Sequence, residues 1–159
     1  MRKHTLAFGA ALLLVASAAY AHVNLQPRES APGVTVTYTM RVPTEGTVTT
    51  TGIELEVPDA ITIVSVDGPE DAYEVRTTGG RIVAIAWKTE ILPKQFKTFT
   101  FVAKNPAAPS EISWKAHQRF ADGTTFDWVE PAGGKRPAGR TNVVVAADKA
   151  AMPADHSKH

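Results

Sequence analysis

The sequence predicts an all-β protein, an antiparallel β-sandwich, from two observations. Short segments in which apolar and polar residues alternate recur along the 159 residues, and eleven prolines and eleven glycines separate them. In addition, no segment shows a sustained helical period. Short strands at regular spacing with turns between them are typical of a sandwich of the immunoglobulin type.

The clearest strand is VTVTYTMRV at 34–42, where apolar residues occupy every second position. This alternation is typical of a half-buried strand. GIELEV at 52–57 repeats the pattern and ends at Pro58, and the dipeptide Gly79-Gly80 marks a tight hairpin. Further strands are expected at 61–66, 73–77, 81–88, 96–103, 111–120, 124–129 and 141–146.

The hairpin at Asp122-Gly123 can close in two registers. A two-residue turn places His117 directly opposite Trp128. A three-residue loop instead places Ala116 opposite Trp128 and His117 opposite Asp127. Because a shift of one residue exchanges the two faces of a strand, the register decides which side of the sheet His117 occupies.

The first 21 residues have the layout of a cleaved secretory signal peptide. Arg2 and Lys3 precede an apolar run over 6–15, and the small residues after it end in Ala-Tyr-Ala at 19–21, just before the start of a strand. This run is shorter than the roughly 20 residues that span a bilayer, so we expect no stable membrane insertion. Cleavage after Ala21 and export to the periplasm are predicted.

The chain is therefore expected to comprise a signal peptide at 1–21, one β-sandwich domain at 22–146 and a flexible polar tail at 147–159. PAGGKRPAG at 131–139 has the composition of a flexible loop. Without the signal peptide, 15 basic and 16 acidic residues remain and form no basic stripe, which argues against nucleic-acid binding. The chain has no cysteine, which excludes disulfides and every thiolate metal site.

Cleavage would make His22 the first residue, with a free α-amine beside its imidazole. The amine nitrogen and Nδ1 can together close a six-membered ring on one metal ion. A free α-amine has an ordinary pKa of about 7.7–8.0, so a metal displaces its proton near neutral pH at small cost. Nitrogen ligands in a plane suit Cu(II), which leads nickel and zinc in affinity. The alternative is that His22 is a tolerated first residue without a role.

Four segments resemble the YcnI-like family of exported bacterial copper-binding domains: HVNLQPRESAPG at 22–33, YTMRVPTEG at 38–46, TFTFVAKNP at 98–106 and WKAHQRFADGTTFDWVEP at 114–131. The similarity extends over nearly all of 22–131, in matching order and spacing. The resemblance implies a cupredoxin-like β-sandwich that binds one Cu(II) per chain through a single-histidine brace.

The resemblance also implies three site residues: His22 as the chelating ligand, Glu45 of VPTEG as the carboxylate, and Trp128 of FDWVEP as an indole beside the metal. Glu45 lies just beyond the strand at 34–42, and a carboxylate oxygen with two nitrogens favours Cu(II) over Cu(I). Glu29 in PRES is the competing carboxylate and lies nearer to His22 in sequence.

The remaining aromatic and histidine residues are assigned outside the site. Trp87 and Trp114 alternate with apolar neighbours and are expected to fill the core. His117 is expected to be a solvated or hydrogen-bonded strand residue. His156 and His159 lie in the polar tail and are left out of the site.

The predicted function is an exported protein that stores, buffers or delivers Cu(II) and is not an enzyme. After cleavage only Met40 and Met152 remain as methionines, so a membrane copper transporter or another periplasmic copper chaperone would have to supply Cu(I) ligands. One alternative is a copper-dependent monooxygenase with an N-terminal histidine brace, for which His117 would be the second imidazole. Another is an adhesion domain without metal.

Overall fold

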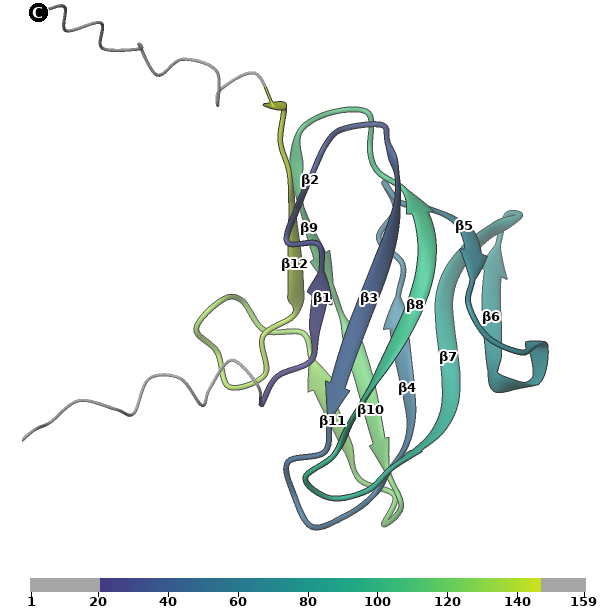
Figure 1. The fold of residues 1–159 in the computed structure, drawn as a ribbon, viewed down its shortest axis with the longest axis vertical. Helices are drawn as coiled ribbons and strands as arrows, with labels where there is room; N and C mark the ends of the chain where they lie inside the picture. Colours follow the sequence, from purple (N-terminus) through teal and green to yellow (C-terminus); the bar gives the residue numbers. More distant parts are fainter. Residues whose placement is uncertain (1–20, 147–159) are drawn as a thin grey trace, which may run out of the picture.

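The computed structural model describes residues 21–146, which form a sandwich of β-sheets (Figure 1). One layer is a four-stranded sheet in the order β1-β3-β8-β5, and the other is a five-stranded sheet in the order β11-β10-β4-β7-β6. A third sheet, β2-β12-β9, contains a parallel pair, β2 with β12, whereas the other strand pairs are antiparallel. The predicted all-β sandwich is confirmed.

The four-stranded sheet consists of β1 (Asn24–Gln26), β3 (Thr35–Pro43), β8 (Phe96–Lys104) and β5 (Thr62–Val66). The five-stranded sheet consists of β11 (Thr125–Trp128), β10 (Ala116–Phe120), β4 (Thr50–Glu56), β7 (Arg81–Ile91) and β6 (Tyr73–Thr78). The third sheet consists of β2 (Glu29–Ser30), β12 (Gly139–Val143) and β9 (Ser110–Trp114), and a single turn of 3-10 helix, η2 (Glu70–Ala72), precedes β6.

The predicted strands are present, although some ends are shifted, as in β12, which was expected at 141–146, and two larger differences occur. The segment expected as one strand at 111–120 is interrupted at Lys115, so that β9 and β10 belong to different sheets. The two-residue strand β2 was not expected, because two residues are too few to show an alternating pattern. Within residues 21–146, no helix is long and apolar enough to cross a membrane.

Some of the sequence predictions fall outside the described residues. These are the signal peptide apart from Ala21, and the tail at 147–159, which contains Met152, His156 and His159. All residues of the domain predicted at 22–146 are among those described.

The core between the two layers is built around aromatic residues. Tyr38 of β3 is completely buried, and its ring centroid lies 5.0 Å from that of Trp114 and 5.6 Å from that of Phe101. Burial raises the pKa of Tyr38, although its hydroxyl donates a hydrogen bond of 2.5 Å to Asn105 Oδ1. Trp87 is also buried, so both tryptophans assigned to the core are confirmed there.

The β10–β11 hairpin has a three-residue loop, 121–123. Ala116 pairs with Trp128, and His117 pairs with Asp127. Gly123 has a φ of 83°, a conformation that glycine adopts without strain. Directly paired residues in a sheet project to the same face, so His117 and Trp128 lie on opposite faces of the five-stranded sheet.

Candidate metal centre

His22 is positioned by the pairing of β1 with β3. Asn24 pairs with Arg41, and the same antiparallel register continued by two residues places His22 beside Pro43, the last residue of β3. Val23 and Leu25 are almost completely buried, and they anchor the segment in the core. The side chain of Asn24 donates a hydrogen bond of 3.3 Å to the carbonyl oxygen of His22.

Trp128, the second predicted site residue, lies against His22. Their ring centroids are 5.6 Å apart and their planes are inclined by 58°. Trp128 is only 5% exposed, and its indole Nε1 donates a hydrogen bond of 3.0 Å to Gln118 Oε1. The fold thus brings together two predicted site residues from opposite ends of the domain.

Gln118 is a residue beside His22 and Trp128 that was not predicted from the sequence. Its side chain is buried, and besides accepting from Trp128 it donates to the carbonyl oxygen of Pro43 at 2.9 Å and to Thr50 Oγ1 at 2.7 Å. It therefore joins the indole to the end of β3 beside which His22 lies. The sequence pattern could have indicated it, because the polar Gln118 occupies an inward-facing position between the apolar residues Ala116 and Phe120.

Glu45, the predicted carboxylate, follows the end of β3 by two residues and is exposed. The residue before it, Thr44, is buried, and its hydroxyl bonds to Thr50 Oγ1 at 2.7 Å and to the carbonyl oxygen of Ile91 at 3.1 Å. The carboxylate of Glu45 makes no hydrogen bond or ion pair with any described residue. Glu45 thus follows the buried Thr44, and no hydrogen bond or ion pair joins it to His22.

Glu29, the competing carboxylate, is placed differently. It lies in β2, where it pairs with Asn142 of β12. This position is beyond the other end of β1 from His22, and Glu29 belongs to the third sheet. The arrangement of strands therefore favours Glu45 over Glu29 as a ligand beside His22.

His117 is held on the outer face of the five-stranded sheet. Its Nδ1 lies 2.6 Å from Asp127 Oδ1, and its Nε2 lies 2.6 Å from Glu56 Oε1. Partial burial opposes the charged imidazolium, but the hydrogen bonds and charges of Asp127 and Glu56 outweigh it and raise the pKa of His117. Both ring nitrogens are engaged on the face away from Trp128, so His117 cannot supply a second imidazole at His22.

Few metal-binding side chains lie close together in the described part of the chain. Across residues 21–146, no three His, Asp or Glu side chains are grouped so as to hold a metal ion. A single-histidine brace needs only two such side chains, because the α-amine is its third ligand. In the uncleaved chain this nitrogen of His22 is bonded to Ala21. If cleavage freed the amine, one imidazole, one carboxylate and that amine would be donors of the types that suit Cu(II).

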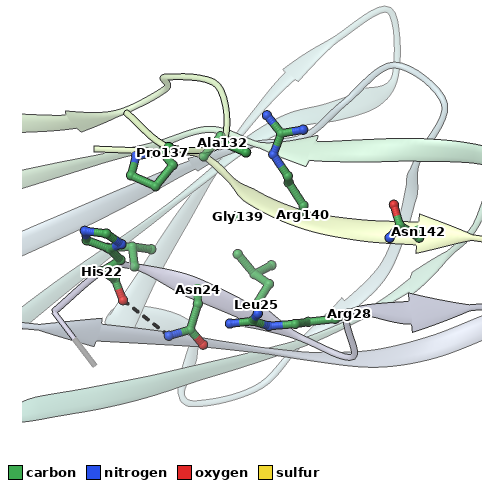
Figure 2. Close-up of a pocket in the computed structure, with 12 residues that line it drawn as sticks. His22, Asn24, Leu25, Arg28, Ala132, Pro137, Gly139, Arg140 and Asn142 are labelled. Carbon is green, nitrogen blue, oxygen red and sulfur yellow. Dashed lines mark hydrogen bonds between the residues drawn. The ribbon is translucent and has the colours of Figure 1, made fainter. Parts of the chain in front are cut away.

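A groove opens beside His22 and runs between β1 and β12 (Figure 2). Its volume is about 460 Å³. We call it the β1–β12 groove. The residues that line it are His22, Val23, Asn24, Leu25, Arg28, Ala132, Gly133, Pro137, Ala138, Gly139, Arg140 and Asn142.

The chain is similar to known proteins in sequence and in fold. Residues 22–146 match the family described as "Domain of unknown function (DUF1775)". The chain is 35% identical over 140 residues to the "Copper-binding protein CutI" of Bacillus subtilis (strain 168), an alignment that covers 85% of this chain and 68% of that protein.

A crystal structure of an uncharacterized protein from Nocardia farcinica, described as an immunoglobulin-like fold, superposes on this chain with a TM-score of 0.66. The sequences are 24% identical, and the superposition covers 79% of this chain and 99% of that protein. This similarity supports the immunoglobulin-like sandwich.

Proposed function

This chain belongs to the DUF1775 family of YcnI-like proteins, and on that premise we propose that it is an exported protein that binds one Cu(II) for storage, buffering or delivery. The relative from Bacillus subtilis is named a copper-binding protein, and this chain is 35% identical to it over 140 residues. Export and the periplasmic location rest on the predicted signal peptide at 1–21.

The observation that carries the proposal is the position of His22. It lies beside the end of β3, against the buried ring of Trp128, and only Thr44 separates this strand end from Glu45, whose carboxylate has no bonding partner among the described residues. Cleavage after Ala21 would add the amine. His22 would then bind Cu(II) through its amine and Nδ1, and Glu45 would contribute an oxygen and partly neutralise the ion.

Trp128 would shield one side of the ion. Its indole is fixed by Gln118 and is closed off from solvent, so it keeps water and oxidants from that side of the His22 ring. A metal cation over an indole face also gains a cation–π attraction. In this role Trp128 is a neighbour of the ion and not a ligand.

The monooxygenase alternative lacks support. It requires a second imidazole beside His22. Within the described chain the other histidine is His117, which is engaged by Glu56 and Asp127 on the opposite face of the sheet. Met40 is completely buried in the core, so a partner such as a membrane copper transporter or another copper chaperone would supply the ligands for Cu(I).

Titration of the mature chain, beginning at His22, with Cu(II) against a coloured competing chelator tests the proposal. We expect one tightly bound ion and an electron paramagnetic resonance spectrum with splitting from nitrogen ligands. Replacement of His22 by Ala and of Glu45 by Gln should weaken binding, whereas Glu29→Gln should not. A His22→Ala chain that binds as tightly as the parent would contradict the brace, and a parent chain that binds no Cu(II) would favour the adhesion domain.

A further inference from the structure

The β1–β12 groove carries positive charge beside the proposed copper site. Its ionisable lining residues are His22, Arg28 and Arg140, and no Asp or Glu lines it. Arg140 pairs through Nη1 with Glu111. Arg28 is exposed, and its guanidinium makes no hydrogen bond or ion pair with any residue between 21 and 146.

The side chain of Arg28 extends back along β1 toward Asn24, as Figure 2 shows. Its guanidinium is therefore directed toward the His22 end of the groove. Asn24 and Asn142 add amide groups to the same lining. A guanidinium presents N–H groups in a plane that matches the two oxygens of a carboxylate, and neighbouring amides can donate to the remaining oxygens.

The floor of the groove is apolar and closely packed. It is formed by Leu25, which is 1% exposed, and β12 passes directly over this residue at Gly139. A Cβ atom at position 139 would lie 2.9 Å from Leu25 Cδ1, so glycine allows the two strands this close approach. An ion pair made over an apolar floor is screened less by water than one on an open surface.

We propose that the β1–β12 groove binds a small polycarboxylate anion. One carboxylate would pair with Arg28, and the others would extend along the groove toward His22. A volume of about 460 Å³ is within the range of sites for small molecules. Resting on the proposed copper function, the groove would let the protein receive Cu(II) as a carboxylate chelate, because Cu(II) accepts carboxylate oxygens beside nitrogen ligands.

Calorimetric titration of the copper-free mature chain with citrate tests the anion site. We expect Arg28→Gln to weaken citrate binding about tenfold or more, because a charge-assisted pair is lost. The matched control is Arg119→Gln, which removes another exposed arginine without a side-chain partner, on β10 of the other layer. Equal citrate affinity in the parent and in Arg28→Gln would overturn the proposal, and so would sulfate that binds as tightly as citrate.

A second measurement separates this proposal from the copper function. In a non-coordinating buffer, Arg28→Gln should bind Cu(II) as tightly as the parent, but it should take up copper from Cu(II)-citrate more slowly. A parent chain that binds citrate and not Cu(II) contradicts the copper function and leaves the anion site standing. If Arg28→Gln binds Cu(II) as tightly as the parent and also takes up copper from Cu(II)-citrate as fast, this result contradicts the role of the groove in copper transfer.

Discussion

The imidazole of His22 lies 5.6 Å from the indole of Trp128, although the two residues are at opposite ends of the domain. The contact forms because β1 is paired with the end of β3, while Gln118 ties the indole to the same strand end. The residue that cleavage would make the first of the chain is thus already seated against a buried aromatic ring. Copper bound there would lie beside an intrinsic fluorescent group.

Trp128 should report the binding of Cu(II). A paramagnetic ion held by His22 quenches a neighbouring indole, so the fluorescence of the parent should fall on titration. Trp128→Phe should remove most of this decrease, whereas Trp87→Phe should retain it, because Trp87 packs against Phe99 in the core. Trp128→Phe should also cost less stability than the roughly 3–5 kcal/mol of a typical Trp→Ala change. Equal quenching in both variants would place the ion elsewhere.

Gln118→Leu should destabilise the fold and weaken copper binding. The substitution leaves the Trp128 N–H and the Pro43 carbonyl oxygen without their partner in a buried site. A buried polar group that loses its partner costs about 1–3 kcal/mol, so the loss should be readily visible in urea unfolding. Gln95→Leu, at an exposed position, is the control and should change stability by about 0.5 kcal/mol or less. Equal losses in both variants would contradict the role of Gln118.

Residues near this site show what local pattern can and cannot predict. Alternation located β3, and the resemblance pointed to His22, Glu45 and Trp128, of which the fold brings the first and last together. The sequence pattern did not reveal the hydrogen bond between Gln118 and Pro43. The two residues are 75 positions apart along the chain, and only the order of strands in the folded protein makes them neighbours.

The register of the β10–β11 hairpin also could not be predicted from the sequence pattern. It depended on whether the loop contains two residues or three, and both lengths suit Asp122-Gly123. The backbone N–H of Thr124 donates to Asp122 Oδ1 at 3.0 Å, which helps to hold the three-residue form. The third residue of the loop decides that His117 pairs with Asp127 rather than with Trp128. Sequence pattern alone does not report a difference of one residue in loop length.

His117 should stabilise the fold in acid and not in base. The pKa of His117 is raised in the folded state, where the protonated ring lies between Asp127 and Glu56, with Glu54 opposite it on β4 and paired with Arg76. A raised pKa means that the stabilisation is fully present below about pH 6.5, the ordinary pKa of histidine, and is lost as the pH rises through the folded value.

The measurement is urea unfolding of the parent and of His117→Gln at about pH 5.5 and about pH 8.5, on either side of the titration. The parent should exceed the variant in stability by more at the lower pH. Arg119→Gln, on the same strand, should show no such dependence. A difference between the parent and His117→Gln that does not change with pH would contradict the assignment.

A chain that retains Ala21 should lose tight copper binding while keeping its fold. With Ala21 in place, the nitrogen of His22 is part of a peptide bond and can no longer act as an amine ligand. If the amine of Ala21 is itself blocked by acetylation, the imidazole would bind without a chelate partner, and since a second linked contact commonly adds a factor of 10²–10⁴, the affinity for Cu(II) should fall by about a hundredfold or more. Competition titration of two chains, one beginning at acetylated Ala21 and one at His22 with a free amine, measures this difference directly. Both chains should show the same urea midpoint, because the anchoring side chains of Val23 and Leu25 are unchanged. Equal copper affinity in the two chains would show that the amine is not a ligand.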